Sequence, residues 1–151
     1  MKKIYFAMMV VLMCWSCSEG MDWDGPAIVN KGHSDCLMST DAEYLATKEI
    51  QTDSVVVSYD GNMLHIEHHN MVLDCSESPS FRNYLTIEGD TLVVHEDVGE
   101  QGQVDCFCLY DNWLDVAELG DGYGCIKIVV ESMWCGNQTS YVVYCSSLWL
   151  H

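Results

Sequence analysis

Along most of the chain, apolar and polar residues alternate in short runs, and glycine, asparagine and aspartate separate the runs. Alternation with a period of two is typical of strands that bury one face. Strands are predicted at residues 54–59, 63–69, 83–88, 91–96, 104–110, 113–119, 126–131 and 141–145. Residues 41–50 alone show some helical character, and no internal repeat is visible. The pattern favours an all-β fold, a small disulfide-bridged β-sandwich of immunoglobulin-like type with about seven to eight strands.

The segments between the runs carry turn chemistry. Asp60-Gly61-Asn62 and Glu88-Gly89-Asp90 each join two predicted strands. Glycine and asparagine accept the positive φ that short hairpin loops impose, so both segments predict β-hairpins. Asp111-Asn112 is interpreted as a further turn. It is not interpreted as a calcium-binding loop, because its acidic residue is not part of the regular spacing of ligands that such a loop has.

The first residues have the layout of a secretory signal. Lys2 and Lys3 precede an apolar run over residues 4–13, which is far shorter than the roughly 20 residues of a membrane-spanning helix. Ser16 followed by Cys17 fits a lipoprotein cleavage site, so we predict a signal peptide over residues 1–17 and a diacylglycerol on Cys17. Cys14 is the rival lipidation site, and an ordinary secretory signal cut nearby is the other alternative. Either form predicts export from the cytoplasm.

Residues 18–35 lack apolar periodicity and contain serine, glycine, aspartate, asparagine and Pro26. They are predicted to be a flexible tether, which places a single β-sandwich domain at residues 36–151. The expected location is the cell envelope, with the lipid in the outer membrane and the domain facing either the periplasm or the exterior.

The composition is strongly acidic, with 23 acidic against 6 basic residues and a formal net charge of −17. Such a charge repels phosphate backbones, so nucleic acid is excluded as a partner. It also disfavours docking of the protein face onto anionic lipids, which leaves the acyl chains as the membrane attachment. The remaining partners are a protein or a glycan of unknown identity.

Seven cysteines follow Cys17 in a compartment where disulfides persist. They are Cys36, Cys75, Cys106, Cys108, Cys125, Cys135 and Cys145. Three bridges and one unpaired thiol are expected. Cys106 and Cys108 share one strand face, and Cys75 is predicted to pair with one of these two. Cys135 and Cys145 flank a turn and could close a hairpin. The alternative for the Cys-x-Cys pair is part of a metal site.

Three segments of the chain carry a resemblance. They are His68-His69-Asn70 followed by Cys75, residues 88–96 (EGDTLVVHE), and residues 106–111 (CFCLYD). Together they span about residues 64–128 and resemble uncharacterised secreted lipoproteins of gut-type, Bacteroidetes-like bacteria that have a Cys-x-Cys strand. In those proteins a Gly-x-Tyr sequence leads into the next strand, whereas Gly122 and Tyr123 are adjacent here. The resemblance implies an exported β-rich lipoprotein and brings no activity with it.

The strand at residues 63–71 is the clearest candidate for binding chemistry, because residues two apart share a face. One face would carry Met63, His65, Glu67, His69 and Met71. The opposite face would carry Leu64, Ile66, His68 and Val72. His65 with Glu67, or Glu67 with His69, could hold copper or zinc if another strand supplied a third ligand. The plain alternative is a solvated polar face.

Signatures of catalysis are absent from the sequence. It has no Gly-x-Ser-x-Gly elbow, no His-Glu-x-x-His helix and no phosphate-binding glycine loop. The Cys-x-x-Cys spacing occurs at Cys14 and Cys17 alone, inside the predicted signal peptide, and not at the start of a helix as in thiol-redox enzymes. We therefore predict a non-enzymatic envelope lipoprotein that acts as a binding module, with a copper- or zinc-binding lipoprotein as the alternative.

Overall fold

The computed structural model describes residues 25–41, 53–61, 63–75, 80–102, 106–120, 122–134 and 136–148. In this part of the chain every regular element is a strand, so the all-β prediction is confirmed. The nine strands are β1 (Ala27–His33), β2 (Met38–Asp41), β3 (Ser54–Tyr59), β4 (Met63–Asp74), β5 (Arg82–Glu88), β6 (Thr91–Gln101), β7 (Cys106–Ala117), β8 (Cys125–Trp134) and β9 (Asn137–Ser147). Within the described ranges, no helix is long and apolar enough to cross a membrane.

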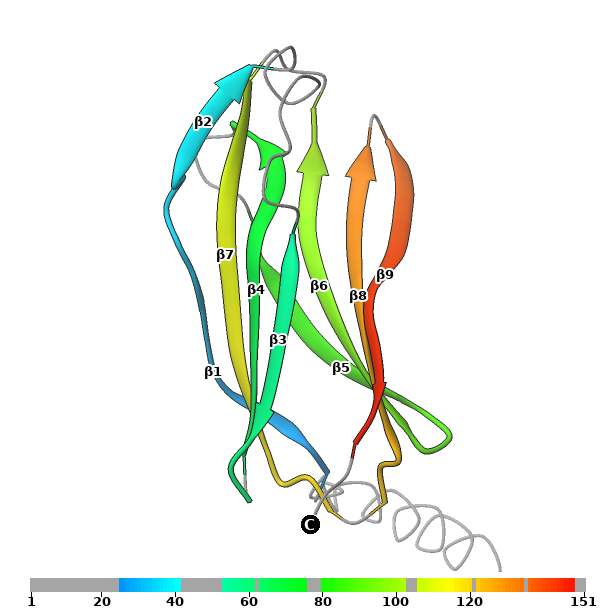
Figure 1. The fold of residues 1–151 in the computed structure, drawn as a ribbon. Helices are drawn as coiled ribbons and strands as arrows, with labels where there is room; N and C mark the ends of the chain where they lie inside the picture. Colours follow the sequence, from blue (N-terminus) through cyan, green and yellow to red (C-terminus); the bar gives the residue numbers. More distant parts are fainter. Residues whose placement is uncertain are drawn as a thin grey trace, which may run out of the picture.

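The strands form two sheets that face each other as a β-sandwich (Figure 1). The first sheet has the order β1-β7-β4-β3, and β2 continues the edge of β7 that β1 begins. The second sheet has the order β5-β6-β8-β9. Among the described pairings, β6 and β8 run parallel and the others are antiparallel. The sandwich is confirmed, while its immunoglobulin-like type stays a prediction.

The core lies between the sheets and follows from the alternation along four strands. Its fully buried members are Leu64, Ile66, Leu114 and Val116 from the first sheet and Leu92, Val94, Ile126 and Ile128 from the second. Each such side chain contributes roughly 1.5–3 kcal/mol relative to leaving it exposed. A smaller apolar cluster around Met71, Val98 and Tyr110 extends the core toward the disulfides.

Both predicted hairpins are present. β3 and β4 are joined at Gly61, whose φ is 89°, and β5 and β6 are joined at Gly89, whose φ is 67°. A side chain at either position would strain the backbone, because this region of φ favours glycine.

Two predictions about irregular segments are wrong. The tether assigned to residues 18–35 contains β1, which pairs along β7 from Ala27 opposite Ala117 to His33 opposite Asn112. The turn assigned to Asp111-Asn112 lies inside β7, so two predicted strands are one. Both turn-forming side chains find partners in the sandwich: Asp111 accepts a hydrogen bond from the backbone of Asn70, and Asn112 is bonded in the interior.

The alternation along β4 also changes partway. It holds up to His68, but the pairing with β7 then skips to Met71, and Asn70 has a φ of 60°. This β-bulge adds one residue and exchanges the two faces beyond it. Met71 is therefore buried and Val72 is exposed, the reverse of the prediction for both.

Two disulfides tie the first sheet together. Cys75 bonds Cys106, which confirms one of the two predicted partners, and Cys36 bonds Cys108. Cys125 and Cys145 are free thiols, so the described residues contain two of the three expected bridges. The predicted Cys135–Cys145 bridge is wrong, because Cys145 is free and lies opposite Lys127, far from the β8–β9 turn. Cys135 itself lies outside the described residues, as do the predicted signal peptide, Cys17 and most of residues 41–50.

Candidate functional site

The three residues predicted as metal ligands lie on the outward face of β4 in two separate groups. His65 Nδ1 donates to Asp115 Oδ1 at 2.8 Å, and His65 Nε2 lies 3.4 Å from Asp60. His69 Nε2 lies 3.1 Å from Glu67 and its Nδ1 lies 3.3 Å from Asp111. Within the described ranges, no three or more His, Cys, Asp or Glu residues form a group that could hold a metal ion. These side chains therefore form acid–histidine pairs on the surface.

Electrostatics at these pairs follows from the hydrogen bonds. The bond to Asp115 and then the bond to Asp60 raise the pKa of His65 above its usual value. The amide of Asn30, which donates to Asp115 Oδ2 at 2.8 Å, and then His65 lower the pKa of the Asp115 carboxyl.

The interior holds a group of polar residues that bridges the two sheets. His68 on β4 and Asn112 on β7 face Asn83 on β5 and Glu96 on β6, and each is at most 9% exposed. Glu96 accepts hydrogen bonds from His68 Nδ1 and from Asn112 Nδ2, both at 2.6 Å. Asn83 Nδ2 donates to Asn112 Oδ1 at 3.1 Å. We call these four residues the inter-sheet quartet.

One atom of the inter-sheet quartet is not satisfied. His68 Nε2 is buried and has no hydrogen-bond partner among the described residues. The nearest acidic atom is Asp53 Oδ2, at 3.6 Å, which is too long for a hydrogen bond. Buried polar atoms in native proteins nearly always have partners, so this atom calls for a physical explanation.

At one edge of the sandwich, the quartet reaches a surface groove between β1 and β5. The groove has a volume of about 370 Å³ and is lined by Lys31, Gly32, His33, Phe81, Asn83 and Asn112. The rings of His33 and Phe81 stack with their centroids 4.7 Å apart. Its polar floor is thus made of two amides that the core holds in place.

The charge at this groove differs from that of the rest of the surface. Of the three described lysines and arginines, Arg82 pairs with Asp97 and Lys127 pairs with Glu88. Lys31 has no carboxylate within ion-pair distance in the part of the chain that the structure describes. Among the described residues, Lys31 therefore gives this groove an ammonium group that no carboxylate neutralises.

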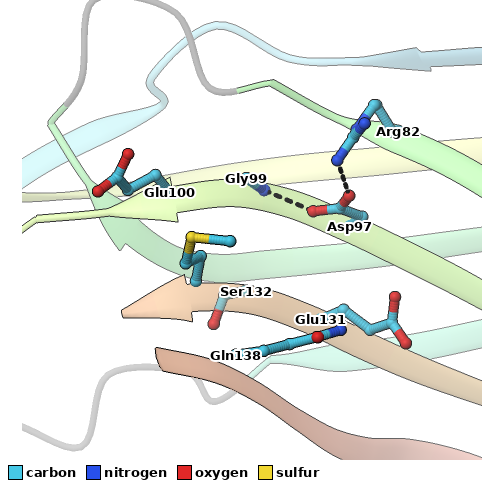
Figure 2. A pocket seen from close by; sticks show the side chains of 8 residues that line it. Arg82, Asp97, Gly99, Glu100, Glu131, Ser132 and Gln138 are labelled. Carbon is cyan, nitrogen blue, oxygen red and sulfur yellow. Dashed lines mark hydrogen bonds and ion pairs between the residues drawn. The ribbon is translucent and has the colours of Figure 1, made fainter. Parts of the chain in front are cut away.

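A second hollow lies on the outward face of the second sheet (Figure 2) and has a volume of about 410 Å³. Its lining residues are Arg82, Asp97, Gly99, Glu100, Glu131, Ser132, Met133 and Gln138. Arg82 is bonded to Asp97 at 2.5 Å, and Asp97 also accepts from the backbone of Gly99 at 2.9 Å. Figure 2 shows the Glu100 and Glu131 carboxylates at opposite ends of the hollow. The one cation is therefore already neutralised, and the acids do not converge.

Beside that hollow, four side chains have the bonding order of a catalytic relay. Thr86 Oγ1 lies 2.7 Å from His95 Nε2, and His95 Nδ1 lies 3.1 Å from Glu131 Oε1. Tyr84 donates to Glu131 Oε2 at 2.5 Å and stacks on His95, and the hydrogen bond to Glu131 raises the pKa of Tyr84 to about 12. Glu131 lines the second hollow, whereas Thr86, at the other end of the relay, lines neither of the two hollows described.

Sequence reasoning did not single out Asn83, Glu96 or Asn112 as functional residues. The interpretation of Asp111-Asn112 as a turn hid Asn112, since turn residues are expected at the surface. One signal was visible: His68 shares an alternating face with Leu64 and Ile66, and a histidine on an apolar face needs a partner from elsewhere. That partner is Glu96, 28 residues farther along the chain.

Comparison of this chain with protein-family models, curated proteins and solved structures found no match.

Proposed function

We propose that this protein is a non-catalytic binding module of the cell envelope, anchored to the outer membrane through a lipid on Cys17. The ligand site of this proposal is the groove between β1 and β5. The observation that carries it is the combination of Lys31, which has no ion-pair partner among the described residues, with the amides of Asn83 and Asn112, which are 9% and 1% exposed. Pockets of roughly 300–1,000 Å³ with a few fixed polar groups are typical of small-ligand sites.

The chemistry of the groove selects the ligand class. An ammonium group favours a carboxylate, and amides both donate to and accept from hydroxyl groups. The stacked rings of His33 and Phe81 add an apolar wall. A small ligand with one carboxylate and several hydroxyls, such as an acidic sugar, matches all three features.

The amides gain their precision from the interior. Glu96 accepts from Asn112, and Asn112 accepts from Asn83, so neither side chain is free to rotate. A site whose polar groups are held in advance loses less conformational entropy when a ligand binds. The same network also fixes how the two sheets face each other, which is a structural role that it performs without any ligand.

Export and anchoring are supported by separate observations. The first residues have the basic, apolar and small-residue order of a lipoprotein signal. Two disulfides join parts of the first sheet, and such bonds persist in oxidising compartments. Mass spectrometry of the protein from bacterial membranes tests the anchor: a diacylated Cys17 at the N-terminus is expected, and an unmodified or uncleaved chain would contradict it.

Binding is tested by calorimetry and by NMR of the side-chain amides, with glucuronate as the probe and glucose as its uncharged match. We expect glucuronate to shift the amide signals of Asn83 and Asn112 and to bind at least tenfold more tightly than glucose. Lys31→Gln should remove this preference, whereas Lys127→Gln, which changes a cation on the other sheet, should leave it intact. Shifts confined to the hollow of Figure 2, or no shift at all, would contradict this ligand site.

A further inference from the structure

Strand β9 is an edge of the second sheet, and its composition differs from that of the rest of this acidic chain. In the described part of the structure it pairs with β8 along one side, and no strand lies along its other side. Its sequence, NQTSYVVYCSS, contains no charged residue and no proline. No acidic or basic residue occurs from Ser132 to Leu150, although the chain has 23 acidic and 6 basic residues. β9 is therefore an uncharged edge on a protein with a net charge of −17.

Most of the other edge strands carry features that discourage pairing with another chain. The unpaired N–H and C=O groups of a sheet edge can bind a further strand, and charged residues, proline or a short edge strand oppose this. β1 contains Lys31, and β5 contains Arg82 and Glu88. β2 is only four residues long and ends at Asp41. β9 has 11 residues and none of these features.

β3 is also an uncharged edge strand, but the residues at its ends discourage pairing with a copy of itself. Asp53 precedes the strand and Asp60 follows it. An antiparallel, in-register pair of β3 strands would therefore place Asp53 opposite Asp60 of the second copy at both ends. Like charges directly opposite each other destabilise a sheet. A pair of β9 strands brings no two charges together.

The first half of β9 presents apolar side chains as well as a free backbone edge. All six residues of the segment Asn137–Val142 are exposed, and Tyr141 and Val142 are 53% and 51% exposed. Successive residues of a strand point to opposite faces, so one of these two apolar side chains lies on each face of the edge. The register with β8 shifts between Val142 and Tyr144, so the regular edge ends there. Its six residues equal the length of a typical strand.

We propose that residues 137–142 of β9 pair antiparallel with the same residues of a second copy of this chain, so that two four-stranded sheets form one continuous sheet. A two-fold symmetric contact uses the same surface on both copies, and an antiparallel pair of identical strands meets this condition. β1 and β5 lie on one side of the sandwich, and β3 and β9 lie on the other (Figure 1). The groove between β1 and β5 therefore stays open in the dimer.

The charge of the chain favours a second copy as the occupant of this edge. Two chains with a net charge of −17 repel each other wherever their acidic surfaces meet. At β9 their backbones can approach without bringing carboxylates together. A basic partner would instead be attracted to the acidic surfaces elsewhere on the protein, since β9 offers it no opposite charge.

The dimer is tested by sedimentation equilibrium of the full mature chain at concentrations from about 1 μM to 1 mM, where a weak contact becomes populated. Cys145→Ser in all samples removes the exposed thiol of this strand, so that no intermolecular disulfide forms through it. We expect the average mass to rise from one chain toward two. Tyr141→Glu with Val142→Glu places a carboxylate on each face of the edge and should weaken dimerisation at least tenfold. Both side chains are more than half-exposed, so this variant should keep its fold, which circular dichroism can verify.

Val29→Glu is the matched control, since Val29 is 55% exposed and lies on β1, the edge strand of the opposite side. It should dimerise as the parent does. Amide hydrogen exchange locates the contact: the amides of residues 137–142 should exchange several times more slowly at 1 mM than at 1 μM, while those of β3 and β5 keep their rates. A single chain at every concentration, slower exchange at β3 or β5 instead of β9, an undiminished dimer in the double variant, or loss of the dimer in Val29→Glu would overturn the proposal.

Discussion

At the residue scale, a carboxylate, an imidazole and two amides occupy positions between two otherwise apolar sheet faces. Glu96 and His68 are fully buried, and Glu96 accepts two short hydrogen bonds. A buried polar group without a partner costs about 1–3 kcal/mol, and a charged one costs more. The inter-sheet quartet is therefore tolerated in the core because its members hydrogen-bond to one another. Removal of any one member leaves a buried polar group without its partner and destabilises the fold.

Asn112→Ala tests this dependence. The change removes the donor to Glu96 Oε1 and the acceptor for Asn83 Nδ2. We expect the free energy of unfolding to fall by about 3 kcal/mol, measured by urea denaturation, because a buried carboxylate loses a partner. Asn30→Ala is the matched control, since its amide donates to Asp115 at the surface, and it should cost less than about 1 kcal/mol. Equal losses would show that burial does not determine the cost.

Tyr84 predicts a pH dependence at high pH. The hydrogen bond to Glu131, and then burial, raise its pKa from 10.0 to about 12. Since the folded pKa is above the unfolded value, the bond stabilises the fold fully below about pH 10, and the stabilisation is lost as pH rises from 10 toward 12. Glu131→Gln should lower the pKa of Tyr84 toward 10, as measured by the ultraviolet absorbance of tyrosinate. Subtraction of the Tyr84→Phe titration assigns the signal, and an unchanged midpoint would contradict the role of Glu131.

At the element scale, strands whose own residues alternate between apolar and polar are predicted correctly from the sequence. A strand that is ordered only by pairing with a neighbour is not predicted. β3 and β5 are close to their predicted bounds, because apolar residues alternate along them and glycine turns end them. β1 has no such pattern in its sequence AIVNKGH, and it is ordered by hydrogen bonds along the edge of β7. The parallel neighbours β6 and β8 come from distant segments with β7 between them in sequence, so no local signal predicts their register.

The same limit applies to the candidate sites. Alternation correctly places His68 on the apolar face, but only the approach of β6 shows that Glu96 is its partner. The predicted ligand face is real up to His69, although its histidines are paired with acids that the sequence does not place there, such as Asp111 and Asp115. The bulge at Asn70 could not be predicted, because asparagine adopts positive φ only occasionally and the local alternation does not mark this position.

Gly32 on β1 gives a prediction at this scale. A Cβ atom at Gly32 would lie 2.5 Å from the Trp113 ring, a distance that side chains do not tolerate. Gly32→Ala should therefore displace Trp113 or β1, lower the free energy of unfolding by about 1–3 kcal/mol, and weaken glucuronate binding in the groove. Gly120→Ala meets nothing within 4 Å and should change neither quantity. Urea denaturation followed by tryptophan fluorescence measures the first effect, and unchanged stability in Gly32→Ala would contradict the contact.

At the scale of the whole molecule, polar chemistry crosses the sandwich from one edge to the other. The groove of β1 and β5 opens on Asn83 and Asn112, the centre holds Glu96 and His68, and the far edge presents Asp53. The apolar core lies along the strands on both sides of this strip.

The two disulfides fasten one end of this assembly and give the last prediction. Cys36–Cys108 closes a sequence separation of 72 residues and joins the segment between β1 and β2 to β7. Cys75–Cys106 closes 31 residues and joins the end of β4 to the start of β7. If restriction of the unfolded chain dominates, the longer loop contributes about 4.4 kcal/mol and the shorter about 3.7 kcal/mol.

Paired cysteine-to-alanine variants separate these contributions in urea denaturation. Cys36→Ala with Cys108→Ala should cost somewhat more than Cys75→Ala with Cys106→Ala, since its loop is longer and Cys108 also packs in the core. Cys125→Ala with Cys145→Ala removes two free thiols and should cost less than about 1 kcal/mol. A large loss in this control would mean that the thiols on β8 and β9 are bonded in the folded protein. A larger loss for the shorter loop would mean that local packing around Cys75, rather than the length of chain enclosed, sets the stabilisation.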